Sequence, residues 1–176
     1  MRSFALSRVY GLLETGPVVL LTTEGKDCRN IMTMSWHTML EFEPPLVGCV
    51  VSSGDYTFHI LNETRECVIA IPTAELSEKV VKVGNTSGRD MDKFKTFSIG
   101  TARASLVKAP LLPDCYANLE CKVIDISLVD KYNFFVLEVV KAWITPGVKY
   151  PKTIHHLGKG YFMVAGDVIK LPSKMR

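Results

Sequence analysis

Residues 29–38, RNIMTMSWHT, place short hydroxyl and amide side chains beside soft apolar ones. If this stretch is a strand, alternate side chains point to opposite faces. One face then holds Asn30, Met32, Met34, Trp36 and Thr38, and the other holds Ile31, Thr33, Ser35 and His37. Neither face is uniformly apolar or polar, as an amphipathic strand would require. The pattern therefore indicates a surface that contacts a flat ligand with polar edges.

Two further stretches have the composition of a phosphate site. Residues 52–57, SSGDYT, precede a predicted helix, whose first N–H groups and dipole favour an anion. The alternative is a simple turn with Thr57 as the helix cap. Residues 84–94, GNTSGRDMDKF, supply two glycines, two hydroxyl groups, Arg89 and Lys93, which could hold a phosphate. Neither stretch is a Walker loop or a Rossmann fingerprint, because the required glycine spacings are missing.

The four histidines and five cysteines form no recognisable metal or nucleophile motif. The sequence has neither a His-x-x-x-His pair nor a Cys-x-x-Cys pair, so we predict no metal site. A Gly-x-Ser-x-Gly elbow is also missing. We assign no catalytic residue, and we expect His59 on the surface of a helix.

Length and composition are those of one folded domain. The chain has 176 residues, enough for a sizeable core, and we predict a single domain over residues 1–176. Hydrophobic residues make up 47% and charged residues 22%, as in globular proteins. The net charge of +3 is scattered and gives no nucleic-acid footprint. Without a membrane-length apolar run or a secretory signal pattern, we predict a cytoplasmic protein that binds neither nucleic acid nor membrane and has no disulfide framework.

Short apolar runs separated by turn residues predict mainly β-structure with short helices. Expected helices cover residues 4–13, 56–64 and about 74–83. Expected strands cover residues 17–24, 29–38, 46–53, 67–72, 115–130, 133–144 and 162–168. A bulge is expected after Val123, where the apolar phase shifts. Because strands do not alternate with long helices, the predicted architecture is a small antiparallel barrel with peripheral helices.

The three polar stretches occur in an order that resembles one known family. NIMTMSW, PPLVGCVVSSGDYTFHILNETRECVIAIP and VGNTSGRDMDKF together resemble the flavin reductase-like, FMN-binding split-barrel family, and its flavoredoxin branch in particular. The later stretches APLLPDCYANLECKVID and TIHHLGKGYFMVAGD are similar to that branch too, so the resemblance extends from about residue 12 to residue 168. It implies a six-stranded antiparallel split barrel and a homodimer with one FMN per subunit near the dimer interface.

The resemblance also implies which residues contact FMN. The flat ligand of residues 29–38 would be the isoalloxazine ring. The ring and its ribityl chain would be contacted by Asn30, Met32, Thr33, Met34, Ser35 and Trp36. The phosphate would be held by Ser52, Ser53, Thr57 and Lys93, with Ser87 and Gly88 closing over it. Alternatives stay open for some of them: Trp36 and one of the two methionines could be core residues, and His155 and His156 could lie near the cofactor or in solvent.

The function implied by the resemblance is redox chemistry on FMN. One interpretation is an NAD(P)H-dependent flavin reductase-like oxidoreductase, in which hydride from NADH or NADPH reaches flavin N5 and electrons pass to free flavin, ferric iron or a protein acceptor. The other is a flavoredoxin-type electron carrier that keeps FMN tightly bound, serves a redox partner protein and does not oxidise nicotinamide. The sequence does not decide between them, nor between NADH and NADPH.

Overall fold

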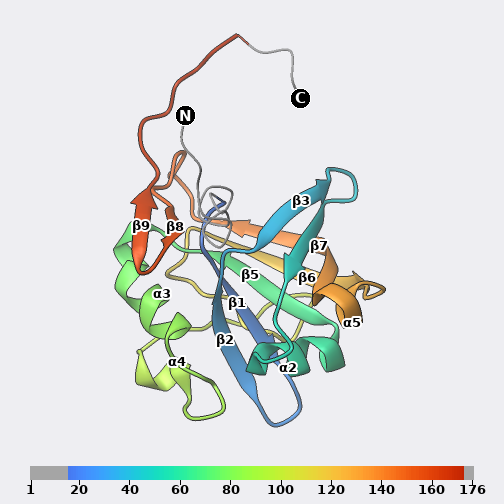
Figure 1. Cartoon of the computed structure of the whole chain (residues 1–176). Coiled ribbons are helices and arrows are strands. Elements are labelled where there is room, and N and C mark those ends of the chain that lie inside the picture. Colours follow the sequence, from blue (N-terminus) through green and yellow to red (C-terminus); the bar gives the residue numbers. More distant parts are fainter. Residues whose placement is uncertain (1–15, 173–176) are drawn as a thin grey trace, which may run out of the picture.

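A computed structural model describes residues 16–172 of the chain (Figure 1). The helix expected over residues 4–13 lies outside the described residues. Seven strands form one antiparallel sheet in the order β2-β1-β5-β6-β7-β4-β3. They are β1 (Val19–Glu24), β2 (Arg29–Met34), β3 (His37–Glu41), β4 (Leu46–Val50), β5 (Glu66–Ile71), β6 (Ala117–Asp125) and β7 (Phe134–Ile144). A separate hairpin pairs β8 (Ile154–Gly158) with β9 (Tyr161–Val164).

Short helices surround the sheet. They are α2 (Tyr56–Thr64), the 3-10 helix η2 (Ala74–Leu76), α3 (Ser77–Gly84), α4 (Lys93–Thr96) and α5 (Val129–Tyr132). In Figure 1, α3 and α4 lie beside β2 on the side of the β8–β9 hairpin, and α2 lies across the foot of β1 and β2. None of the helices within residues 16–172 has the length and apolar character that crossing a membrane requires. The predicted fold class, mainly β with short helices in a split barrel, is confirmed.

The sheet has seven strands, not the six that the resemblance implies, and one expected strand accounts for the difference. Residues 29–38 do not form one strand but divide at Ser35 and Trp36 into β2 and β3. These strands lie at the two opposite edges of the sheet. Because only two residues connect the edges, the sheet must curl until the edges approach each other. This short connection explains the half-open barrel.

The strand β1, which lies next to the edge strand β2, is buried on both of its faces. Val19 and Leu21 point into the barrel and pack with Phe135 and Leu137. Leu20 points to the outer side and packs with apolar residues of α3 and α4. Both faces of β2 are covered as well, by the barrel interior and by α3. This double coverage explains why residues 29–34 do not alternate between apolar and polar.

The strands in the second half of the chain confirm one expected feature and differ elsewhere from the expected bounds. The expected bulge after Val123 is confirmed by a register shift between Val123 and Asp125. The strand expected over residues 115–130 ends at Asp125, however, because the Asp125 carboxylate accepts the Ser127 N–H at 2.7 Å and starts a turn that leads into α5. The last strand spans Tyr161–Val164 and not residues 162–168, and its partner β8 was not expected. The turn between them uses the positive φ of Gly160.

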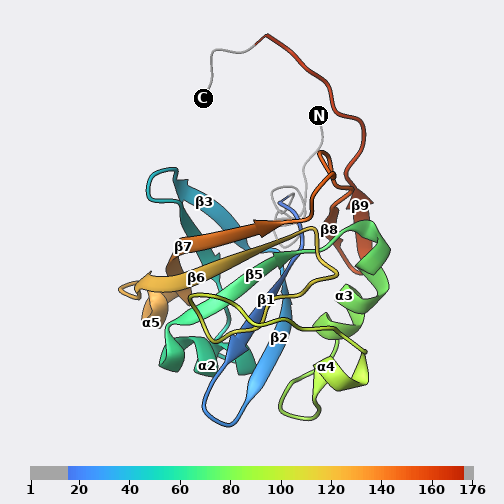
Figure 2. The ribbon, with the colours of Figure 1, turned by 180° about the vertical axis from the view of Figure 1, so that it is seen from behind.

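The long segment 99–112 runs across the back of the sheet (Figure 2). A buried carboxylate fixes it there. Glu120, on β6, is fully buried and accepts the backbone N–H groups of Ser105, Leu106 and Val107. It also accepts the indole N–H of Trp143 at 2.8 Å. Burial by itself would raise the pKa of this carboxyl group, but the hydrogen bonds outweigh burial and leave the pKa below its ordinary value. The carboxylate form is therefore the one that holds the segment.

We expect Glu120→Gln to lower the free energy of unfolding by about 2–3 kcal/mol, since an amide NH₂ cannot accept the N–H groups that surround it. Urea denaturation measures this loss, and Glu63→Gln, on the exposed side of α2, should change stability by less than about 0.5 kcal/mol. Because the pKa of Glu120 is lowered in the folded state, its carboxylate stabilises the fold at pH values above the ordinary pKa of 4.5. This stabilisation is lost as the pH falls through the lowered pKa of the folded protein. Equal acid sensitivity of the variant and the wild type would contradict the assignment.

Candidate functional site

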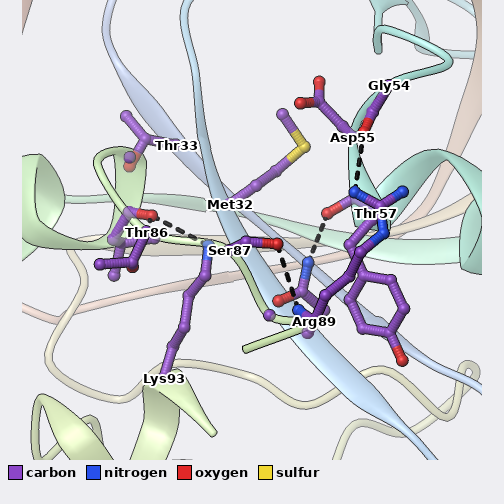
Figure 3. Close-up of a pocket in the computed structure, with 14 residues that line it drawn as sticks. Met32, Thr33, Gly54, Asp55, Thr57, Thr86, Ser87, Arg89 and Lys93 are labelled. Atoms are coloured by element: carbon purple, nitrogen blue, oxygen red, sulfur yellow. Dashed lines mark hydrogen bonds between the residues drawn. The ribbon is translucent and has the colours of Figure 1, made fainter. Parts of the chain in front are cut away.

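The three polar stretches of the sequence meet in one pocket at the edge of the sheet, which we call the edge pocket (Figure 3). It has a volume of about 310 Å³. One wall is β2, the second is the start of α2 with its preceding turn, and the third is the end of α3 with the following loop. The lining residues are Asn30, Met32, Thr33, Gly54, Asp55, Tyr56, Thr57, Val83, Gly84, Thr86, Ser87, Gly88, Arg89 and Lys93.

The position of β2 at the sheet edge makes its backbone available to the pocket. In an antiparallel pair, alternate residues of an edge strand point their N–H and C=O groups away from the neighbouring strand. The Ile31 carbonyl points outward, because it accepts a hydrogen bond from Lys93 of α4. The backbone groups of Thr33, two residues further on, therefore point outward too. Thr33 lines the pocket, and its hydroxyl donates to the Val80 carbonyl at 2.6 Å, which ties β2 to α3.

Lys93 brings a positive charge into the pocket, and no carboxylate of residues 16–172 forms an ion pair with it. Its side chain is 4% exposed, and its ammonium donates to the Ile31 carbonyl at 3.0 Å and to the Val83 carbonyl at 2.9 Å. The two ion pairs found within residues 16–172 do not include it. Burial lowers the pKa of Lys93, and the charge of Asp55 opposes that effect. An ammonium has three N–H donors, so one remains for a ligand, and a buried cation favours an anion there.

The amide oxygen of Asn30 is a second polar atom that can bind a ligand. It is 3% exposed, and its amide nitrogen donates to the Thr57 hydroxyl oxygen at 2.8 Å. Its amide oxygen is buried and has no hydrogen-bond partner in the described part of the chain. Because Thr57 accepts from Asn30, its own O–H proton is available to an acceptor. The cap alternative for Thr57 is wrong, since the N-cap of α2 is Asp55 and the cap makes no side-chain hydrogen bond.

A second pocket adjoins the first, and we call it the hairpin pocket. Its volume is about 300 Å³, and it shares Thr33 and Gly84 with the edge pocket. Its other lining residues are Val18, Ser35, Val80, Val81, Asn85, His156, Gly160 and Phe162. The rings of His156 and Phe162, from β8 and β9, lie 5.2 Å apart. A ligand with a charged polar end and a flat apolar end could therefore extend from one pocket into the other.

The structure brings together most of the residues that the sequence singled out. Seven line the edge pocket, namely Asn30, Met32, Thr33, Thr57, Ser87, Gly88 and Lys93. Ser35 lines the hairpin pocket, and so does His156. His155 does not; its ring contacts the Thr153 hydroxyl at 2.9 Å.

Besides His155, four of the residues predicted to contact FMN line neither pocket. Met34 is 4% exposed and packs in the barrel core, whereas Trp36 is 54% exposed between the two edge strands. Ser52 and Ser53 are exposed in the turn before α2, where the Ser52 hydroxyl accepts the Gly54 N–H at 3.2 Å. Contacts of these four residues with a ligand stay predictions.

Several residues of the two pockets were missed from the sequence. Thr86 is one of the two hydroxyl groups counted in residues 84–94, but it was not named for FMN contact; it lines the edge pocket, and its hydroxyl donates to the Lys82 carbonyl at 3.0 Å. Phe162 and Gly160 enter the site through the β8–β9 hairpin, which was not expected. The turn sequence LGKGY, with two glycines between apolar residues, was the available signal for it. Within residues 16–172, no three histidine, cysteine or acidic side chains gather as metal ligands would.

Comparison with known proteins gives one consistent result. The sequence model of the flavin reductase like domain matches residues 13–162. The chain is 34% identical to the uncharacterized protein YddH of Escherichia coli (strain K12) over 170 residues, covering 88% of this chain and 89% of that one. The FMN-binding domain of a flavin reductases-like enzyme from Shewanella baltica OS155 has the same fold, with a TM-score of 0.83 and 23% identity over 97% of each chain. The flavoredoxin of Desulfovibrio vulgaris (Miyazaki F) also has a TM-score of 0.83, with 18% identity over 99% of this chain and 95% of that one.

We expect Gly88→Ala to damage the edge pocket. A Cβ at this position would lie 2.1 Å from the amide oxygen of Asn30, so either the loop or Asn30 must move. Overpacking of this kind costs about 1–3 kcal/mol of the free energy of unfolding, which thermal or urea denaturation measures. Gly54→Ala is the matched control on the opposite wall, because its Cβ would meet only the Ser52 hydroxyl at 3.6 Å. Equal stability of the two variants would mean that the loop does not press on Asn30.

Proposed function

Because the chain belongs to the flavin reductase-like family, we propose that it is an FMN-binding oxidoreductase that uses the edge pocket and the hairpin pocket as one cofactor site. The phosphate of FMN occupies the edge pocket, and the isoalloxazine ring lies toward the hairpin pocket. The observation that carries this proposal is the Lys93 ammonium, which is buried beside two carbonyl groups and has no carboxylate partner among the described residues.

The residues present fit the phosphate of FMN. Lys93 supplies a charge-assisted donor, and Thr57 supplies a hydroxyl in the first turn of α2. The N-terminus of this nine-residue helix adds backbone N–H groups and the positive end of its dipole. The loop hydroxyls of Thr86 and Ser87 line the third wall. All these donors converge on one anion, and no Rossmann element offers a place for a second phosphate, which favours FMN over FAD.

The protein's part in the chemistry is binding and orientation. FMN, when bound, supplies hydride acceptance at N5 and onward electron transfer. Lys93 neutralises the phosphate and fixes that end of the ligand. Outward-pointing backbone groups of β2 and the amide oxygen of Asn30 offer partners to polar atoms of the ligand. Val18, Val80 and Phe162 give the hairpin pocket an apolar lining that excludes water from a ring.

Two ways of using the cofactor remain as proposals. In the first, NADH or NADPH reduces FMN, and electrons pass to free flavin, ferric iron or a protein. In the second, the protein is an electron carrier of the flavoredoxin type and serves a redox partner protein, as the shared fold with the Desulfovibrio flavoredoxin suggests. We propose the first, because the sequence model that matches residues 13–162 is that of a flavin reductase like domain.

Mass spectrometry of the cofactor released from the purified protein should identify FMN. NADH or NADPH, added without oxygen to the yellow protein, should then bleach the flavin absorption band. A band that stays oxidised with both nucleotides, but bleaches with dithionite, would favour the electron carrier. Recovery of FAD alone, or of no flavin after reconstitution with FMN, would contradict the cofactor site itself.

Lys93→Ala should weaken FMN binding by about ten- to a hundredfold, because a charge-assisted hydrogen bond contributes about 1.5–3 kcal/mol. Fluorescence titration of the apoprotein with FMN measures the dissociation constant. Lys95→Ala is the matched control on the same helix, since Lys95 is exposed and pairs only with Asp92 at 3.8 Å. An unchanged dissociation constant for Lys93→Ala would place the phosphate elsewhere.

We also propose a homodimer that covers the edge strand β3. An exposed edge strand offers unpaired backbone groups to another chain. Exposed apolar residues on or beside β3 add to this surface, namely Trp36, Met39, Leu40 and Phe42, with exposed fractions of 46% to 75%. Since Trp36 follows directly on Ser35 of the hairpin pocket, a partner on β3 would lie close to the cofactor.

Sedimentation of apo and FMN-loaded protein over a dilution series should show a dimer that FMN stabilises, because a ligand that prefers the dimer shifts association by mass action. A charged pair of substitutions, Met39→Glu with Leu40→Glu, should move the protein to the monomer. Replacing exposed Tyr132 of α5 by Glu serves as the control away from β3. A monomer at micromolar concentration that holds FMN tightly would contradict the proposal.

A further inference from the structure

Arg89 joins two walls of the edge pocket (Figure 3). Its guanidinium Nη1 donates to the Gly54 carbonyl at 2.9 Å. The same group lies over the ring of Tyr56, 5.6 Å from the ring centroid. Gly54 and Tyr56 belong to the α2 wall, and Arg89 belongs to the loop that follows α3. Within residues 16–172, this is the one side-chain hydrogen bond found between that loop and the turn before α2.

The loop is fixed at its two ends and depends on Arg89 in between. At the start, the Thr86 hydroxyl donates to the Lys82 carbonyl of α3 at 3.0 Å. At the far end, the Asp92 carboxylate accepts the Lys95 N–H and caps α4. Arg89 is exposed, so its contact can break without disturbing the core. The loop can therefore open locally if the Arg89 contact is lost.

The groups beneath the loop are those that can still bind a ligand. Gly88 presses so closely on Asn30 that a Cβ would lie 2.1 Å from the amide oxygen. That oxygen is buried and has no partner in the described part of the chain, and the buried Lys93 ammonium lies on the same pocket. With Arg89 in place, the loop covers these groups. A ligand held by them would lie beside the contact between Arg89 and Gly54, since all of these residues line the edge pocket.

We propose that Arg89 is a latch whose contact with Gly54 sets how slowly a phosphate-bearing ligand leaves the edge pocket. Arg89 is a positioning residue that acts through the loop and takes no part in electron transfer. The identity of the ligand as FMN rests on the proposed function. With the Arg89–Gly54 contact in place, bound FMN exchanges slowly, as a prosthetic group does. When the contact is lost, bound FMN exchanges faster.

The latch differs in a measurable way from a direct contact between Arg89 and the phosphate. A direct contact works through positive charge, so Arg89→Lys would preserve it. The latch needs a planar guanidinium that reaches Gly54 and stacks on Tyr56, which a lysine ammonium does not reproduce. Arg89→Lys and Arg89→Gln should therefore behave alike if Arg89 is a latch.

The first experiment measures FMN release by stopped-flow fluorescence after dilution of the loaded protein. Both Arg89 variants should release FMN about five- to tenfold faster, as expected from one exposed hydrogen bond. They should also bind FMN faster, because the same contact holds the loop over the pocket before FMN binds. Arg103→Gln, an exposed arginine in the segment behind the sheet, is the matched control and should change nothing. A wild-type release rate in Arg89→Lys, or in both variants, would overturn the latch.

The second experiment uses no ligand, so it tests the Arg89 contact whether or not the ligand is FMN. The Asp90 N–H donates to the Ser87 carbonyl at 3.2 Å inside the loop. Hydrogen exchange of this amide in the ligand-free protein should be about two- to tenfold faster in Arg89→Gln and unchanged in Arg103→Gln. An unchanged rate in Arg89→Gln would overturn the latch even if FMN binds. A wild-type protein that binds no FMN, but whose loop exchanges faster in Arg89→Gln, would overturn the proposed function and leave the latch standing.

Discussion

The site depends on the hydrogen bonds of the Lys93 ammonium. Its two hydrogen bonds join α4 to the outward-facing edge of β2 and to the last turn of α3. Those three elements form the base of the edge pocket, so one side chain both builds the pocket and places a positive charge in it. A buried ammonium held only by carbonyl dipoles is costly to keep, because two neutral acceptors replace a full hydration shell. An anion in the pocket would offset that cost.

The sequence predicted the fold class and the meeting of the three polar stretches, but for different reasons. Strand and turn patterns indicated an antiparallel barrel, because apolar runs with turn residues between them are local features. The approach of residues 29–38, 52–57 and 84–94 is a matter of tertiary structure, and only their ordered resemblance to a family predicted it. Asn30, Thr57 and Lys93 were placed correctly in one pocket by that route.

What the sequence could not supply depends on contacts between distant elements. The division of residues 29–38 at Ser35 is set by pairing with β1 on one side and β4 on the other, and nothing in the ten residues marks it. Met34 and Met32 have the same residue type and the same strand phase, yet Met34 is enclosed by the barrel while Met32 reaches the pocket at the strand edge. The role of Arg89 needs the Gly54 carbonyl, 35 residues away, to be recognised at all.

The same division of residues 29–38 links the proposed cofactor site to the opposite edge of the sheet. Ser35 lines the hairpin pocket, and His37 already belongs to β3. The connection is held firmly, because the Trp36 carbonyl accepts the Val50 N–H at 3.0 Å and the His37 ring contacts the Pro17 carbonyl at 2.7 Å. A ligand that shifts Ser35 must therefore shift the start of β3 with it. Since coupling free energies between two binding sites are reciprocal, a chain that docks on β3 would change the affinity for the ligand by the same factor. A ligand in the hairpin pocket and a chain docked on β3 would therefore be coupled through residues 35–37, although β2 and β3 lie on opposite edges of the sheet in its hydrogen-bonding order.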